Sequence, residues 1–468
     1  MSLIRHIEII GLNDHLDVSI PISGPHCVIV GPNGSGKSTA LLIVAAALGR
    51  QWKRLSELRF ARLVLTFDSG ASASLSRLSC KKYVSTLSSY GRRMPARVMK
   101  SLQEGKLLND FLSVDFRNSS SVEKYSELLR LAPVELRHLQ GELQLGNAGK
   151  GSEKEVVDFQ SLLEAENVPT TIYLPTYRRI ELELKKIFDQ VPDAYRSVLS
   201  TQVNFGSSNE FIVEMVRFGM EDVKSTIQTF EKETREYARN RFNRMMTSYL
   251  KEMANSQVLS VTNLRAMNIN AKTIDVVLSR IEEGLLSPSE KEEIASIVLE
   301  LSDGRSAGNP PFNKKWLAHF FVRLLQVNRE IEVKETPIRL LVSSLQKYFM
   351  PAKVVDYDIE NYHFAIKSTG AEGEHSDELS LSELSSGEKQ LVSVLSHLHF
   401  MTHKKVNIII DEPELSLSVP WQADFLPDIA GTAACNQIFA VTHSPFTYDH
   451  LSSSVVDFLP RPTSAPKP

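Results

Sequence analysis

The sequence GPNGSGKST occupies residues 31–39, directly after the apolar run HCVIV at 26–30 and before a segment with the composition of a helix. A strand, a glycine-rich loop and a helix, in this order, are the context in which the pattern G-x-x-x-x-G-K-[ST] binds nucleotide phosphates. Gly31, Gly34 and Gly36 carry no Cβ, so backbone N–H groups can surround an anion. The helix N-terminus adds partial positive charge at the same point.

Each residue of this loop receives a role from its chemistry. We expect Lys37 to reach the β- and γ-phosphates and the Ser38 hydroxyl to bind Mg²⁺. The other ATP-binding residues are expected to be Asn33, Gly34, Ser35, Gly36 and Thr39.

A second half of the site is expected about 370 residues later. The run VNIII at 406–410 has the pattern of a strand buried on both faces, and it ends in Asp411 and Glu412. Because α/β sheets bind ligands at the carboxyl ends of their strands, we expect Asp411 to bind Mg²⁺ and Glu412 to be the catalytic general base. A similar run at 437–441 precedes His443, which is expected to be catalytic through contact with the γ-phosphate; a purely structural histidine is the alternative.

These motifs, together with LSSGEKQ at 384–390, appear in the order typical of ABC-type ATPases, which the chain resembles. The Glu-Lys pair after Gly387 resembles the branch that contains Rad50, SMC, RecF and OLD proteins. The segments EPELSL and THSP are most similar to OLD-like ATPases of prokaryotic anti-phage systems, with the PARIS ATPase subunit the nearest type and the Septu ATPase the second.

The resemblance implies an α/β fold: an ABC-ATPase head with a mixed P-loop sheet, an N-terminal antiparallel β layer and a large helical or coiled-coil insertion. It implies that the signature residues contact ATP held by another subunit, so that ATP and Mg²⁺ join two copies of the chain. Segment 414–418 would be the D-loop at that interface. Ser386 replaces a usual glycine, and Ser418 replaces a frequent histidine; either change would slow hydrolysis. The signature residues are Ser385, Ser386, Gly387 and Glu388.

The spacing of the motifs predicts how the chain is divided. We expect the head to be formed by 1–84, 169–184 and 351–458, helical insertions at 85–168 and 185–350, and a disordered tail at 459–468. LPTYRR at 174–179 resembles a Q-loop that couples nucleotide to the insertion, with an ordinary basic helix start as the alternative. A heptad stripe that begins at Val216 and continues through Phe230 predicts a helical arm within 209–253, and another helix is expected from 314 to about 333.

The amino-acid composition limits the classes of partner and the compartment that can be expected for this protein. The net charge is −3, so nothing in the bulk charge calls for nucleic acid, although basic clusters at 92–100 and 314–315 leave DNA as a candidate. Three scattered cysteines fit a reducing compartment. No apolar run approaches the roughly 20 residues of a membrane span, and the N-terminus lacks a signal-peptide pattern, so a cytoplasmic protein without membrane contact is expected.

The resemblance favours the regulatory ATPase of an anti-phage complex, a homo-oligomer that controls a separate TOPRIM-type nuclease and responds to a phage-encoded trigger protein. The alternative is a DNA-repair ATPase similar to RecF or Rad50 that binds duplex DNA. A transporter's nucleotide subunit is disfavoured, because Lys37 and Leu384 lie too far apart in the sequence for such a compact domain.

Overall fold

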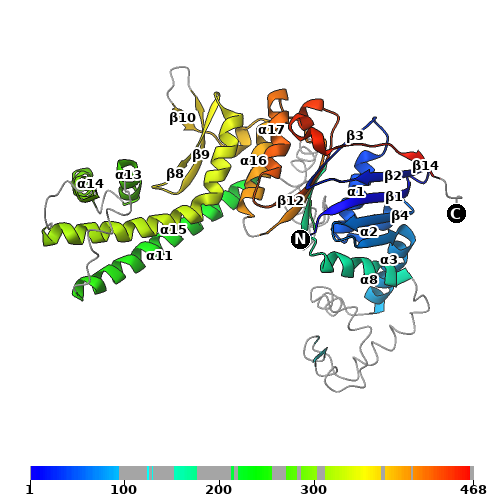
Figure 1. Cartoon of the computed structure of the whole chain (residues 1–468), viewed down its shortest axis with the longest axis horizontal. Coiled ribbons are helices and arrows are strands. Elements are labelled where there is room, and N and C mark those ends of the chain that lie inside the picture. Colours follow the sequence, from blue (N-terminus) through cyan, green and yellow to red (C-terminus); the bar gives the residue numbers. More distant parts are fainter. Residues whose placement is uncertain are drawn as a thin grey trace, which may run out of the picture.

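A computed structural model describes residues 2–93, 124–125, 129, 152–175, 212–214, 220–255, 270–281, 286–302, 311–369, 375–401 and 404–463. Across these ranges the chain is an α/β protein with one parallel and two antiparallel sheets, from which long helices extend (Figure 1). The expected fold class is confirmed, although the described core sheet is purely parallel rather than mixed.

The parallel sheet carries both halves of the nucleotide motif. Its order is β13 (Val455–Asp457), β3 (His26–Val30), β12 (Cys435–Val441), β11 (Val406–Asp411), β6 (Thr170–Leu174) and β7 (Ile212–Glu214). All residues of β11 are buried, as the apolar run predicted. Strand β3, which precedes the glycine-rich loop, and strand β11, which ends in Asp411, lie two positions apart in this sheet. Strand β12, from the C-terminal part of the sequence, lies between them.

Each face of this sheet supports a separate core. Ile408 and Ile410 pack with helices α16 (Ser386–Phe400) and α17 (Val419–Ala430), whereas Ile409 packs with α1 (Lys37–Leu48). This alternation follows from the two-residue period of a strand. Helix α1 and helix α16 therefore cover opposite faces of one sheet.

The N-terminal layer is an antiparallel sheet of order β14 (Arg461–Pro462), β2 (Leu16–Pro21), β1 (Ile4–Leu12), β4 (Arg62–Phe67) and β5 (Ser72–Ser76). Helices α2 (Trp52–Glu57), α3 (Arg77–Arg93) and α8 (Ser152–Ala165) lie beside it (Figure 1). The buried side chain of Gln437 on β12 joins the layer to the parallel sheet. It accepts from Ile4 N at 2.9 Å and donates to Ile4 O at 2.8 Å.

Two long helices form an arm that extends side by side from the part of the chain that contains the parallel sheet (Figure 1). Helix α11 (Met220–Ala254) packs along α15 (Phe312–Phe349), with α13 (Ala271–Ser279) and α14 (Pro288–Ser302) against α15. Val223 and Ile227 of the predicted stripe are buried, and Thr234, expected to interrupt it, is fully buried as well. At the base of the arm lies an antiparallel sheet of order β10 (His375–Glu378), β9 (His363–Thr369) and β8 (Lys353–Asp358).

Two expectations about these elements were wrong. Within the tail expected to be disordered at 459–468, Arg461–Pro462 instead pairs as β14 with β2, and Thr463 Oγ1 donates to Asp17 at 2.9 Å; residues 464–468 lie outside the described part of the chain. The helix expected to end near residue 333 continues through Pro337 to Phe349, because its buried face runs without a break into the main core. The helical arm expected within 209–253 corresponds to α11, which begins at Met220, and Ile212–Glu214 before it forms strand β7 and pairs with β6.

Candidate nucleotide-binding site

The glycine-rich loop connects β3 to α1 with a backbone that requires glycine. Gly34 and Gly36 have φ angles of 75° and 98°, in the left-handed region that side chains other than glycine rarely adopt. A Cβ on Gly36 would also lie 3.1 Å from the Leu12 side chain. The loop is thereby shaped to point amide groups toward one side, at the N-terminus of α1.

Lys37 lies at the centre of this loop and is only 4% exposed. Its Nζ donates to the carbonyl oxygens of Gly31 at 2.9 Å and Pro32 at 2.7 Å. Burial lowers the pKa of Lys37, against the opposing influence of the Asp411 and Glu412 carboxylates. The ammonium group is thus held beside the acidic end of β11.

The two residues expected to bind Mg²⁺ are in direct contact. Ser38 Oγ donates to Asp411 Oδ1 at 3.0 Å, across 373 positions of sequence. Mg²⁺ prefers oxygen ligands and normally completes its shell with water and substrate phosphates, so a hydroxyl and one carboxylate fit this ion. In the described ranges no cluster of three or more His, Cys, Asp or Glu side chains offers a metal a different site.

Glu412 and His443 follow neighbouring strands and lie at the same edge of the sheet. Asp411 is in register with Val441, and Glu412 N donates to Val441 O at 2.8 Å. Glu412 has a φ of 51°, a strained value for a residue other than glycine, and such strain is typical of functional sites. The side chain of His443 is exposed. The backbones of both expected catalytic residues therefore lie at the carboxyl end of the parallel sheet, the end at which Asp411 lies.

The signature segment forms the start of α16. Ser385 is the N-cap, and it shares a capping box with Glu388, whose Oε2 accepts from Ser385 N at 2.7 Å. Lys353 Nζ donates to the other oxygen of Glu388 at 2.6 Å. Burial raises the pKa of Glu388, but the hydrogen bonds from Lys353 and Ser385 outweigh it and lower the pKa overall. The Glu388 carboxylate is thus engaged within its own chain, whereas Ser385 and Ser386 are exposed.

Glycine at position 387 has a local steric reason. A Cβ there would lie 2.3 Å from the carbonyl oxygen of Ser416, so α16 and the D-loop are in contact backbone to backbone. Ser416 itself has a φ of 67°. The sequence motif contains this glycine, but nothing in its spacing indicates the contact that requires it.

Glu414 is a site residue to which the sequence motifs gave no individual role. Its Oε1 accepts from His443 N at 2.8 Å and Ser444 N at 3.2 Å, and its Oε2 accepts from Thr442 Oγ1 at 2.8 Å. The order of the residues places Glu414 in the D-loop but does not show which backbone groups its carboxylate contacts.

Several sequence-based expectations lie outside the site or outside the described residues. The segment LPTYRR is described only as far as Pro175, and residues 94–100 of the first basic cluster are not described. In the second cluster, Lys314 donates to Glu300 at 2.6 Å. That lysine is therefore partly neutralised and gives no separate indication of DNA binding.

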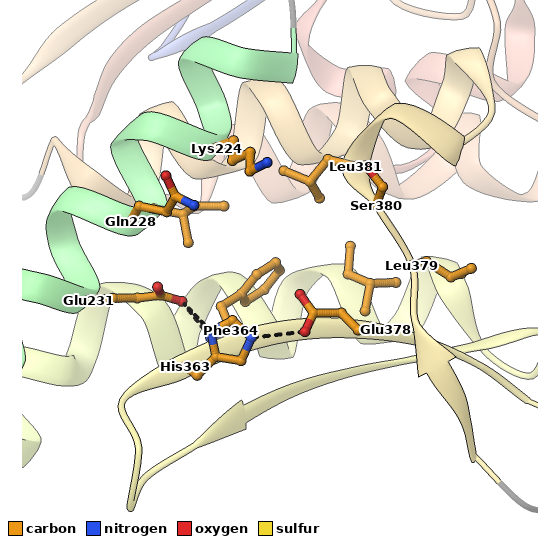
Figure 2. Close-up of a pocket in the computed structure, with 11 residues that line it drawn as sticks. Lys224, Gln228, Glu231, His363, Phe364, Glu378, Leu379, Ser380 and Leu381 are labelled. Carbon is orange, nitrogen blue, oxygen red and sulfur yellow. Dashed lines mark hydrogen bonds and ion pairs between the residues drawn. The ribbon is translucent and has the colours of Figure 1, made fainter.

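A cavity of about 410 Å³ lies between α11, strands β9 and β10 and the segment that leads to the signature. Figure 2 shows His363 between two carboxylates, with Glu231 Oε1 at 3.2 Å from one ring nitrogen and Glu378 Oε2 at 3.0 Å from the other. The hydrogen bond to Glu378 raises the pKa of His363; burial opposes this effect and Glu231 adds to it. This histidine links the arm to the small sheet that precedes the signature.

Comparison with known proteins supports a nucleotide-binding class. Residues 263–449 match the family model described as AAA domain, putative AbiEii toxin, Type IV TA system. The matched range contains the signature segment, Asp411, Glu412 and His443, and the glycine-rich loop lies outside it. No curated protein matches the chain.

Two solved structures are similar over nearly the whole chain, but weakly. One is the Smc head domain with an extended coiled coil bound to the C-terminal domain of ScpA from Pyrococcus furiosus, at 12% identity and a TM-score of 0.32, covering 99% of this chain and 97% of that one. The other is SmcHead bound to the C-winged helix domain of ScpA, at 11% identity and a TM-score of 0.33, covering 98% of each chain. Scores this low do not establish a common fold.

The family match and the geometry of the glycine-rich loop define the class. Residues 263–449 are thus similar to an AAA ATPase domain, and the segment 31–39 has the sequence and the backbone conformation of a P-loop. Among the helices described, none is long and apolar enough to cross a membrane.

Proposed function

We propose that the protein hydrolyses ATP at the site formed by the glycine-rich loop and the end of β11. The observation that carries this proposal is the 3.0 Å hydrogen bond between Ser38 and Asp411. It brings together an anion-binding loop and an acidic strand end that the sequence separates by 373 positions. Such a pair serves phosphoryl transfer, in which catalysis is mostly positioning and charge stabilisation.

In this proposal each residue of the site has one role in the reaction. The loop amides and Lys37 hold the phosphate oxygens, and Glu412 orients and deprotonates the attacking water. His443 contacts the γ-phosphate from the neighbouring strand. Ser38 and Asp411 would hold Mg²⁺, which supplies charge neutralisation at the phosphates.

We further propose that a second copy of the chain completes the site. Helices α1 and α16 pack on opposite faces of the parallel sheet, and the exposed residues Ser385 and Ser386 lie at the start of α16, on the face that α1 does not cover. A γ-phosphate bound by one copy can then accept hydrogen bonds from the signature of another. ADP lacks that group, and pairing should therefore depend on ATP.

The biological setting that fits best is a defence complex. The family model matched by residues 263–449 is described as a putative AbiEii toxin of a type IV toxin–antitoxin system, and the motifs resemble PARIS and Septu ATPase subunits. We propose a scaffold that restrains a separate TOPRIM-type nuclease until a phage-encoded protein releases it. A RecF- or Rad50-like role in DNA repair is the alternative. Duplex-DNA affinity that falls steeply with salt would favour the repair role.

The catalytic assignment is tested with two substitutions and a control. Lys37→Ala should weaken ATP binding about 10- to 100-fold, because it removes a charge-assisted hydrogen bond from the phosphates. Glu412→Gln should leave ATP binding intact, lower the hydrolysis rate about 10²- to 10⁴-fold and lengthen the lifetime of ATP-bound dimers. Glu292→Ala, an exposed position on α14, serves as the control and should resemble the wild type.

ATP affinity by calorimetry, phosphate release, and mass in solution with and without ATP give the readouts. Unchanged affinity in Lys37→Ala would refute the P-loop assignment. Wild-type turnover in Glu412→Gln would refute the role of that carboxylate as the base.

A further inference from the structure

The D-loop contacts two parts of the ATPase site at once. Its backbone turns twice after β11, with Leu415 N donating to Glu412 O and Leu417 N donating to Glu414 O, both at 3.1 Å. The first contact is made by the Glu414 side chain, which reaches the segment that carries His443. The second is made by the Ser416 carbonyl, which lies against the backbone of the signature at Gly387.

The Glu414 carboxylate uses both of its oxygens on one short segment. One oxygen accepts the backbone N–H groups of His443 and Ser444, and the other accepts the Thr442 hydroxyl. Ser444 Oγ in turn donates to Gln422 Oε1 at 2.7 Å, so the same segment is also tied to α17. Hydrogen bonds to an ionised acceptor are stronger than neutral ones, and three of them fix the backbone on which the His443 side chain is carried.

We infer that Glu414 is a positioning residue, which acts on hydrolysis through His443 and links that histidine mechanically to the signature helix. The link is short: Glu414 holds residues 442–444, and Ser416, two residues further, is in backbone contact with Gly387. A displacement of α16 when a second copy binds must move the Ser416 carbonyl, because a backbone contact cannot relax by changing a rotamer. The inference rests on the proposed ATPase activity.

The contact geometry predicts a split between binding and turnover. In the described part of the chain, the Glu414 carboxylate accepts its hydrogen bonds from residues that follow β12 and not from the P-loop. ATP affinity should therefore change by less than about twofold in Glu414→Ala. The turnover number should fall by up to about 10²-fold, the scale of a misplaced catalytic group. The turnover number of Glu414→Gln should fall less, because the amide oxygen of glutamine can still accept hydrogen bonds from the two N–H groups.

Two further measurements separate a positioning role from a structural one. First, if Glu414 acts through His443, Glu414→Ala should slow the His443→Ala variant no further. Second, hydrogen exchange of a peptide containing residues 442–446 should become roughly tenfold faster in Glu414→Ala, because His443 N and Ser444 N lose a charged acceptor. Asp449→Asn is the matched control, since Asp449 is an exposed carboxylate on the following helical segment and should change neither quantity.

The outcomes decide between the inferences. The role of Glu414 would be overturned if Glu414→Ala had an unchanged turnover number, or if it lost ATP affinity in proportion to turnover. It would also be overturned if the effects of Glu414→Ala and His443→Ala on turnover multiplied in the double variant, or if hydrogen exchange at residues 442–446 were unchanged. If the wild type does not hydrolyse ATP, the proposed function fails instead. The exchange measurement needs no nucleotide and still reports whether Glu414 holds the segment.

Discussion

Substitution of Gly387 by alanine tests whether this signature residue is needed for the fold of a single chain. The added Cβ would lie 2.3 Å from the Ser416 carbonyl oxygen, where real Cβ contacts almost never come under 3.0 Å. The two backbones must therefore separate by at least 0.7 Å, the difference between these distances. Neither contacting atom belongs to a flexible side chain, so either α16 or the strained turn at Ser416 must shift.

The magnitude follows from two opposing effects. Overpacking costs about 1–3 kcal/mol, and a contact between two backbones should fall in the upper part of that range. Alanine in place of glycine within a helix recovers up to about 1 kcal/mol. For a chain of 468 residues, the net loss of about 1–2 kcal/mol should lower the melting temperature by roughly 1–2 °C.

The assay is thermal unfolding without nucleotide, at a protein concentration at which copies do not pair. Gly24→Ala is the matched control, because a Cβ at Gly24 meets no atom within 4 Å. Gly431→Ala is intermediate, with its Cβ 3.3 Å from the Pro427 carbonyl. If Gly387→Ala melts together with Gly24→Ala, the local steric argument is wrong, and the glycine would serve only the contact with a second copy.

Two further predictions concern the arm and its base. In the wild type, both oxygens of Glu335 accept hydrogen bonds at 2.7 Å from Arg280, whose side chain is fully buried. Glu335→Ala should destabilise the protein by about 3–5 kcal/mol in urea unfolding, because it leaves this buried charge without its counter-charge. Full stability in that variant would contradict this expectation. His363 has a raised pKa in the folded state, so its stabilising contribution is complete below its unfolded pKa of about 6.5 and is lost as the pH rises through the folded value. Urea unfolding of the wild type and of His363→Gln should therefore differ most near pH 6 and progressively less at higher pH, and a constant difference would refute this assignment.

Local chemistry made much of the site predictable. The glycine-rich loop and the buried strand β11 depend on residues within a few positions of one another. Capping, the left-handed conformations of glycine and the two-residue period of a strand are readable from sequence, because each acts over one turn or one strand. The division into domains and the roles assigned to individual site residues stay predictions.

The sequence by itself predicted a P-loop for nucleotide phosphates and located the acidic strand end. Only the tertiary structure decided that the C-terminal strand β14 pairs with β2, that Gln437 joins the two sheets, and that Glu414 holds the His443 segment. The physical reason is distance along the chain. The sequence shows that a carboxylate or amide side chain can form hydrogen bonds, because this capacity belongs to the residue type. Which groups it bonds depends on how the backbone folds, since the partners can lie several hundred positions away in the sequence.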